Sequence, residues 1–263
     1  MYHWVISLRR CHVGSDQGSS FFPVAVADER ALRLDDGDAT VVFGLGPAVG
    51  CAADGGRLHE VAKALGLRAA RWARQVHSST VVRVEAPRDE PEACVGAADG
   101  LITSEIGVGL AVWTADCVPV ILVAPGAVAA VHAGWRGCAD GIAAVAVSRL
   151  TALDGRPPET LTAYLGPAIS ARHYEVGPEV AATLAATGVD PTFWLHGDRV
   201  DLRNFLTAQL ATLGVSRVHS IGQCTFHSRD LASYRRDGEE AGRQWSLVFR
   251  TPTHPSSKLK VQS

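Results

Sequence analysis

The chain of 263 residues lacks any apolar run as long as the roughly 18 residues that a membrane-spanning helix needs. Its first ten residues place a short apolar stretch before the basic pair Arg9-Arg10, the reverse of the order in a secretory signal. Charged residues make up only 20% of the chain, and the formal net charge is −2, without the basic excess typical of nucleic-acid-binding proteins. We therefore expect a soluble cytoplasmic protein that binds neither nucleic acids nor membranes.

The chain also lacks a Cys-x-x-Cys pair, although it has six cysteines. They are Cys11, Cys51, Cys94, Cys117, Cys138 and Cys224. In a reducing compartment, scattered thiols of this kind are mostly small buried hydrophobic residues. Only Cys117 has neighbours in the sequence that indicate a chemical role.

The 263 residues, 47% of them hydrophobic, are enough to bury a substantial core. No internal repeat or low-complexity linker divides the chain, so we predict a single domain over residues 1–250. Residues 251–263 are polar and contain Pro, Ser and Lys, which predicts a disordered tail. Strand and helix patterns alternate along the rest, which is typical of an α/β or α+β domain with a mixed sheet.

The middle of the chain contains three short apolar runs, Val108–Thr114, Val118–Val123 and Ala127–His132. Tight turns separate them, so we predict an antiparallel meander. Before them, the alternation over Val76–Glu85 predicts a strand. Helical spacing predicts helices over Arg57–Leu65, from about Cys138 to Leu150, and over Asp201–Leu213, where Asp201 is the expected N-cap.

The predicted hairpin brings Cys117 close to His132. If its turn is centred between Ala124 and Pro125, the two residues lie directly opposite one another. A shift of the turn by one residue offsets them by two positions. Directly opposed Cβ atoms are about 5 Å apart and diagonal neighbours about 7 Å, so either register leaves both side chains near a single ion.

A thiolate and an imidazole together suit zinc, and a catalytic zinc usually takes three protein ligands and a water. His77, near the start of the predicted strand, is the best third candidate among the ten histidines. The spacings of 40 and 15 residues match no compact zinc-finger pattern. They favour a zinc site that the fold assembles from distant segments.

At these residues the chain resembles a known family. Arg74–His77 (RQVH), Thr114–Val120 (TADCVPV) and Val131–Gly137 (VHAGWRG) resemble signature segments of the zinc-dependent purine nucleoside phosphorylases. Older descriptions call this bacterial family, which has human relatives, laccase-domain or polyphenol-oxidase-like, and one branch is described as a peptidoglycan-editing factor. Further matching segments run in order along the chain: Ala98–Thr103, Leu165–Ile169, Tyr174–Gly177, Cys224-Thr225 and Ser233–Gly238.

The resemblance implies one domain with mixed β-sheets sandwiched between helical layers. It places the family's metal ligands on His77, Cys117 and His132, with zinc as the metal and copper in the older descriptions. It also implies phosphorolysis of adenosine, inosine, guanosine and methylthioadenosine to the free base and ribose 1-phosphate, with some deamination of adenosine. The expected partners are thus purine nucleosides and phosphate.

Asp116 and Arg136 are the candidate catalytic residues. Asp116, next to Cys117, orients a ligand or accepts a proton, or else it only stabilises a turn. Arg136 lies in a glycine-flanked loop that opens a helix, where backbone N–H groups favour an anion. We expect it to bind phosphate or substrate, the alternative being a solvated surface arginine.

Four further arginines are candidate substrate-binding residues. Arg235 and Arg236 form a basic turn, which either faces the pocket or is a salt-bridged surface pair. Arg74 is a candidate for the same task. Arg57 matches an arginine of the relatives, but the asparagines that accompany that arginine are absent from this chain, which puts the contact in doubt.

Other functions fit parts of the pattern. A metal-free cysteine hydrolase would use Cys117 as nucleophile and His132 as base. A copper-dependent polyphenol oxidase needs many histidine ligands, and the chain has no His-x-His pair. A non-catalytic module with a structural zinc and a zinc hydrolase that edits peptidoglycan precursors also remain open.

Overall fold

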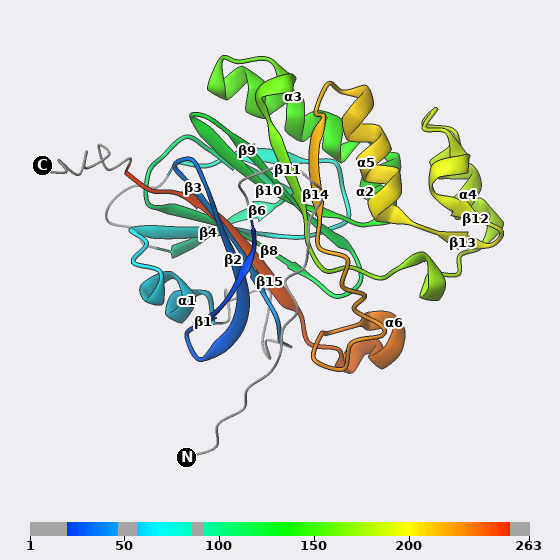
Figure 1. The fold of residues 1–263 in the computed structure, drawn as a ribbon, viewed down its shortest axis with the longest axis horizontal. Helices are drawn as coiled ribbons and strands as arrows, with labels where there is room; N and C mark the ends of the chain where they lie inside the picture. Colours follow the sequence, from blue (N-terminus) through cyan, green and yellow to red (C-terminus); the bar gives the residue numbers. More distant parts are fainter. Residues whose placement is uncertain (1–19, 47–56, 86–91, 253–263) are drawn as a thin grey trace, which may run out of the picture.

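The computed structural model describes residues 20–46, 57–85 and 92–252 (Figure 1). The amino-terminal segment with its basic pair and residues 253–263 of the expected tail lie outside the described residues. No helix in the described ranges combines the length and the apolar character that a membrane crossing requires.

The described residues form two large mixed sheets and one small hairpin. The first sheet contains β1 (Phe22–Val26), β2 (Glu29–Asp36), β3 (Ala39–Gly44), β15 (Gln244–Arg250), β8 (Val108–Thr114), β4 (Ala69–Arg74) and β6 (Glu92–Ala97), in that spatial order. The second contains β14 (Arg217–Ser220), β11 (Thr162–Leu165), β9 (Val118–Ala124), β10 (Ala127–Ala133), β7 (Gly100–Thr103) and β5 (Val81–Arg83). The small hairpin joins β12 (Leu195–His196) to β13 (Arg199–Val200).

Six α-helices occur in the described residues. They are α1 (Leu58–Ala64), α2 (Trp135–Ala139), α3 (Ile142–Asp154), α4 (Pro178–Ala185), α5 (Leu202–Thr212) and α6 (Tyr234–Asp237). Short 3-10 turns cover Pro158–Thr160, Ala171–His173, Pro191–Phe193 and Gly238–Glu240. The predictions over Arg57–Leu65 and Asp201–Leu213 are confirmed as α1 and α5, and the Asp201 side chain caps α5 by accepting from the Asn204 N–H.

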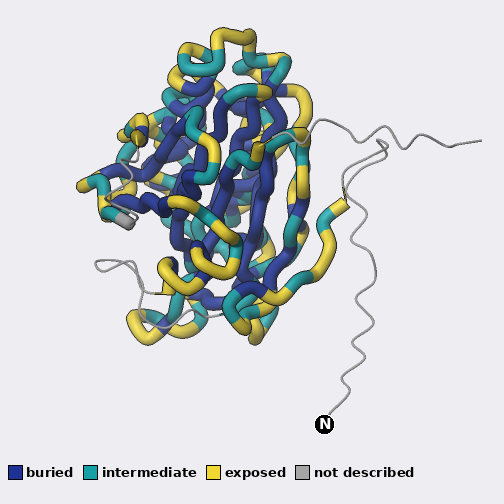
Figure 2. Tube along the Cα trace, turned by 90° about the vertical axis from the view of Figure 1, so that its left-hand side faces the viewer, coloured by how far each residue is buried: buried dark blue, intermediate teal, exposed yellow. Residues whose placement is uncertain are grey.

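The two large sheets pack face to face between helical layers, and the buried chain segments concentrate in their strands (Figure 2). Apolar residues of α1 pack with the outer face of the first sheet. Those of α3 and α5 cover the outer face of the second sheet. In Figure 1, α1 accordingly lies on the opposite side of the strands from α3 and α5. The expected α/β class, with mixed sheets sandwiched between helical layers, is confirmed.

The predicted three-stranded meander is wrong in its first member. β8 pairs with β15 and β4 in the first sheet, whereas β9 and β10 form a hairpin in the second. All seven residues of β8 are buried, as expected for a strand covered on both faces. The chain changes sheets within Ala115–Cys117, where Asp116 adopts a left-handed conformation with φ of 91°. Ala115–Cys117, predicted as a hairpin turn, therefore connects the first sheet to the second.

The predicted strand over Val76–Glu85 is also wrong for most of its length. A strand not predicted from the sequence, β4, ends at Arg74, and only Val81–Arg83 of the predicted stretch pairs, as β5. His77 lies between these strands in a turn, with φ of 60°. In addition, Glu92–Ala97 forms β6, a strand not predicted from the sequence, and the helix expected from Cys138 is divided into α2 and α3 at the left-handed Gly141.

Candidate metal centre and cavity

The site forms where the chain crosses twice from the first sheet to the second. One crossing follows β4 and carries His77, and the other follows β8 and carries Cys117. β4 and β8 are parallel neighbours, so both crossings start at the carboxyl ends of adjacent strands of the first sheet. The third residue, His132, lies near the end of β10, which runs antiparallel to β9 and so returns to the point where β9 begins.

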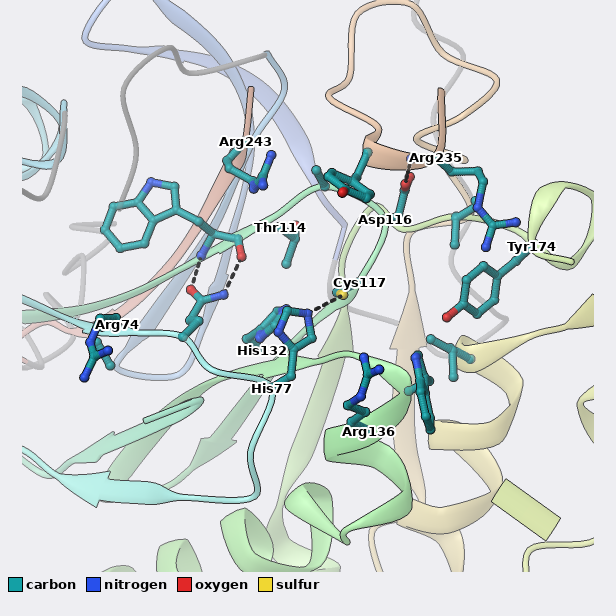
Figure 3. A pocket seen from close by; sticks show the side chains of 18 residues that line it. Arg74, His77, Thr114, Asp116, Cys117, His132, Arg136, Tyr174, Arg235 and Arg243 are labelled. Carbon is teal, nitrogen blue, oxygen red and sulfur yellow. Dashed lines mark hydrogen bonds between the residues drawn. The ribbon is translucent and has the colours of Figure 1, made fainter. Parts of the chain in front are cut away.

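The register of this hairpin is the shifted one of the two expected. His132 pairs with Pro119, so Cys117 is offset from His132 by two positions and lies just before β9. His77, Cys117 and His132 nevertheless converge, with one ligand atom from each lying within 4.8 Å of the others (Figure 3). The Sγ of Cys117 is 3.9 Å from Nε2 of His77, and the two imidazole rings stand edge to face with centroids 4.8 Å apart.

Asp99, on the short link between β6 and β7, holds two of these residues. One carboxylate oxygen is 2.8 Å from Nδ1 of His132 and 3.0 Å from the backbone N–H of His77. The other oxygen accepts from the backbone N–H groups of Val76 and Ser78 and from the Ser78 hydroxyl. Because Nδ1 of His132 is occupied, its Nε2 is the nitrogen left for a metal ion.

The crossing that carries His77 is also held by the side chain of Gln75, which hydrogen-bonds to β8 as a neighbouring strand would. The Gln75 amide donates to the backbone carbonyl of Trp113 at 2.7 Å, and its oxygen accepts from the Trp113 N–H at 2.8 Å. This pair of bonds continues the pairing of β4 with β8 beyond the end of β4. It therefore fixes the turn that carries His77 against the strand that leads to Cys117.

The electrostatics of the group favour a thiolate beside an imidazolium when no cation is bound. Burial raises the pKa of Cys117, but the charge and hydrogen bonds of His132 and His77 outweigh burial and lower it. Burial lowers the pKa of His132, yet the Cys117 thiolate and the Asp99 carboxylate outweigh this effect and raise it. A bound cation takes the place of this proton, so metal binding releases protons.

Gly134 leaves the space that the group occupies. A Cβ at this position would lie 2.8 Å from Cδ2 of His77 and 3.1 Å from Sγ of Cys117. The backbone of Gly134, with φ of −81° and ψ of 169°, is open to any residue, so close approach alone explains the glycine. With two imidazoles and a thiolate, the geometry and the donors fit a metal ion with an open position.

The group lies in a cavity of about 720 Å³, within the size range of small-molecule sites. Arg74, Arg136 and Arg235 line this cavity, as does Asp116. The Arg136 guanidinium stacks over the Trp135 ring at 4.4 Å, and that of Arg235 lies 5.1 Å from the Tyr174 ring centre. Arg136 belongs to α2, which has only five residues, rather than to the start of a long helix as expected.

Asp116 uses both carboxylate oxygens within the protein. One accepts from the Thr225 hydroxyl and the other from the backbone N–H of Arg235, each at 2.6 Å. The Asp116 side chain thus ties the crossing that carries Cys117 to the segment that carries Arg235. Of the two sequence interpretations, this arrangement favours the structural one, since the carboxylate is already occupied.

Two of the predicted arginines do not line the cavity. Arg236 turns into the protein, where its guanidinium donates to the carbonyls of Thr225, Phe226, Ser228 and Leu231 and pairs with Asp237. Arg57 lies beside α1 and bonds to Glu29, Glu60 and the carbonyl of Ala27. Both guanidinium groups are occupied by protein acceptors.

Three residues of the site were not singled out from the sequence. Asp99 belongs to a matching segment, and its signal was an acid directly before the apolar run at 100–102. Tyr174 lines the cavity and points its hydroxyl towards the metal group in Figure 3. Burial, then the charge of Cys117, raises the pKa of Tyr174, so its phenol stays protonated. Arg243 also lines the cavity, and no sequence pattern distinguishes it from a surface arginine.

Comparisons with known proteins identify similar chains. A family described as "Multi-copper polyphenol oxidoreductase laccase" matches residues 56–251 of the chain. A Streptomyces griseus protein, purine nucleoside phosphorylase ORF3, is 41% identical over 214 residues, which cover 76% of this chain and 85% of that protein. A purine nucleoside phosphorylase of Deinococcus radiodurans is 37% identical over 194 residues, covering 72% and 74% of the two chains.

Solved structures share the fold. Protein NMB0706 of Neisseria meningitidis superimposes with a TM-score of 0.70 at 29% identity, covering 88% of this chain and 99% of that one. YlmD of Geobacillus stearothermophilus superimposes with a TM-score of 0.72 at 27% identity, covering 84% and 96%.

Replacing Asp99 tests its hold on the metal group. In Asp99→Asn one carboxylate oxygen is replaced by an NH2 group, which cannot accept a hydrogen bond from the surrounding donors. The orientation of His132 is therefore lost. We expect affinity for Zn²⁺ to fall about 10- to 100-fold, measured by competition with a chromophoric chelator. Asp140→Asn, at an exposed aspartate just after α2, is the matched control. A folded Asp99→Asn protein with wild-type affinity would contradict this role.

The close approach at Gly134 gives an independent test that removes no ligand. In Gly134→Ala the new methyl group displaces His77 and Cys117, so we expect Zn²⁺ affinity to fall by at least about tenfold, in line with other disturbances around metal ligands. Because His77 is exposed, stability to urea should change little. Gly222→Ala is the control, since no atom lies within 4 Å of a Cβ there. Equal Zn²⁺ affinities for the two variants would refute the argument.

Proposed function

Because this chain belongs to the family described as multi-copper polyphenol oxidoreductase laccases, and its relatives include proteins called purine nucleoside phosphorylases, we propose that it is a zinc-dependent purine nucleoside phosphorylase. The substrates are adenosine, inosine, guanosine and methylthioadenosine. Phosphate cleaves each of them to the free base and the 1-phosphate of its sugar.

One observation carries this proposal. A metal-binding group lines the same cavity as Arg136 and Arg235, two arginines with no carboxylate partner within the described part of the chain. Phosphorolysis needs a phosphate held next to the sugar carbon and support for the negative charge that develops on the departing base. The cavity provides cationic groups for the first task and a metal-binding group for the second.

Zinc is the metal that the three ligands favour, since two imidazoles and one thiolate leave a fourth position open. His77, Cys117 and His132 would hold it. When bound, zinc supplies a Lewis acid at the reacting atoms. Asp99 fixes the orientation of His132 and the turn of His77, and the raised pKa of His132 in the metal-free protein makes loading dependent on pH.

The remaining roles fall to residues of the cavity. Arg136 and Arg235 bind the phosphate, and their aromatic partners hold the guanidinium planes in place. The Tyr174 phenol, which keeps its proton, donates a hydrogen bond to the substrate. Tyr234 lines the cavity yet is 51% exposed, and its ring offers a face for a purine. Asp116 acts as a positioning residue through Arg235 and the Cys117 crossing.

Deamination of adenosine is a further reaction that we propose for this cavity. It requires water to attack C6 of the purine, with ammonia as the leaving group, and a metal ion with an open position suits this hydrolysis. The two reactions share the nucleoside but differ in the nucleophile. Phosphate should therefore be required for the first and not for the second.

A metal-free cysteine hydrolase is the second candidate. The lowered pKa of Cys117 and the neighbouring His132 favour it, since a thiolate beside an imidazolium is the resting state of such enzymes. The convergence of His77 on the same point has no part in that mechanism. The space kept open at Gly134 likewise fits a metal group better than a catalytic pair.

The proposed function is tested by metal analysis together with chromatography of adenosine incubated with and without phosphate. We expect about one zinc ion per chain, adenine only when phosphate is present, and inosine in either condition. Removal of zinc should abolish adenine release. Adenine release that survives verified zinc removal would refute the role of zinc, and a metal-free protein inactivated by iodoacetamide would favour the cysteine hydrolase.

Arg136→Gln tests the assignment of the phosphate site. Loss of a charge-assisted contact costs about 1.5–3 kcal/mol, so we expect the KM for phosphate to rise roughly 10- to 100-fold. The KM for the nucleoside should change much less, as measured by steady-state kinetics. Arg149→Gln, at an exposed arginine of α3 away from the cavity, is the matched control. An unchanged KM for phosphate would move the phosphate site away from Arg136.

A further inference from the structure

The cavity contains more positive charge than a single phosphate requires. Four arginines line it: Arg74, Arg136, Arg235 and Arg243. Among the described residues, the one carboxylate that lines it is Asp116, whose two oxygens are already occupied by Thr225 and by the backbone of Arg235. A cavity wall with this excess attracts anions and raises their local concentration.

None of these arginines has a carboxylate partner among the residues that the structure describes. The Arg235 guanidinium donates to the carbonyl of Glu175, and that of Arg243 to the carbonyls of Ala241 and Gly242. Arg136 stacks on Trp135. By contrast, Arg57 and Arg236, which do not line the cavity, have carboxylate partners. The four in the cavity therefore keep their charge available to a ligand.

Arg74 and Arg243 both lie at the carboxyl end of β4 and β8 in the first sheet. Arg74 is the last residue of β4, and Arg243 immediately precedes β15, while β8 lies between these strands. β4 is parallel to β8, and Gln244 of the antiparallel β15 pairs with Thr114 at the end of β8. Both arginines thus emerge at the same end of the sheet, two strand spacings or roughly 10 Å apart, a gap that long side chains can span.

Arg136 and Arg235 lie on other elements of the cavity wall. Arg136 belongs to α2 and Arg235 to α6, and each lies over an aromatic ring. In Figure 3, Arg74 lies to the left of the metal group, Arg243 above it, Arg235 to its upper right and Arg136 below it. The cationic groups are therefore distributed around the metal group rather than gathered on one anion.

We propose that the cavity takes purine nucleoside 5′-monophosphates as substrates, with their phosphomonoester bound by Arg74 and Arg243. This inference rests on the proposed function, in which Arg136 and Arg235 bind the inorganic phosphate. Each phosphate carries roughly 1.5 to 2 negative charges at pH 7. Two phosphates therefore balance the four guanidinium groups of the cavity.

The reaction is the same phosphorolysis with a charged sugar. An oxygen of hydrogen phosphate bonds to C1′ as the bond from C1′ to the purine nitrogen breaks. The bonding electron pair leaves with the purine, which gains the proton that the hydrogen phosphate carried. The products are the free base and ribose 1,5-bisphosphate, and no oxidant or further reactant is needed.

The test compares inosine 5′-monophosphate with inosine, neither of which has an amino group at C6 to lose. Binding to the zinc-loaded protein is measured by calorimetry in phosphate-free buffer, where no phosphorolysis occurs. We expect the monophosphate to bind at least tenfold more tightly, with a preference that falls as salt screens the charges. Arg74→Gln and Arg243→Gln should each reduce this affinity ratio at least tenfold, and Arg149→Gln should preserve it.

The arms of the experiment separate the alternatives. Equal affinity for inosine and its monophosphate overturns the inference and leaves the proposed function intact, whereas failure of both to bind overturns the two together. If inorganic phosphate alone binds to the wild-type protein, and Arg74→Gln or Arg243→Gln weakens that binding as much as it weakens binding of the monophosphate, these arginines hold a free phosphate and the inference is wrong. With phosphate added, chromatography should show hypoxanthine and ribose 1,5-bisphosphate, and tight binding without hypoxanthine release rules out the substrate assignment.

Discussion

The buried carboxylate of Asp99 is the interaction on which the site depends. Its two oxygens accept from three consecutive backbone N–H groups and the hydroxyl of Ser78, and one of them also meets the His132 ring. Burial raises the pKa of Asp99, but the hydrogen bonds from His132 and Ser78 outweigh it and lower the pKa well below its usual range. The carboxylate therefore stays charged, and one side chain fixes a turn of the first crossing and a ring at the end of β10.

The sequence was most informative where a local pattern determines local structure. The hairpin of β9 and β10, helix α1 and the Asp201 cap of α5 follow from periodicity and turn chemistry, and the convergence of Cys117 with His132 follows from the hairpin. The meander failed because nothing in Ala115–Cys117 shows that a chain leaves one sheet for another. The partner of β8, strand β15, lies more than 120 residues further along the chain.

Dependence on distant segments of the chain also explains why only some of the predicted arginines line the cavity. Arg74 and Arg235, two of the four predicted substrate-binding arginines, line the cavity, whereas the other two, Arg57 and Arg236, bond to the protein. Arg235 and Arg236 are adjacent, so their different fates depend on the direction in which α6 presents each side chain. Arg243 gave no signal at all, because its place beside the cavity results from the pairing of β15 with the distant β8.

The origin of the three ligands has a mechanical consequence. His77 and Cys117 lie on the two connections that leave the first sheet, and His132 is part of the second. An ion held by all three would therefore crosslink the two sheets. It would close a loop of 55 residues between His77 and His132, much as a covalent crosslink does. Metal binding at this site would stabilise the native protein relative to the unfolded chain. The metal supply would then also affect resistance to proteolysis, because proteases cleave the unfolded chain.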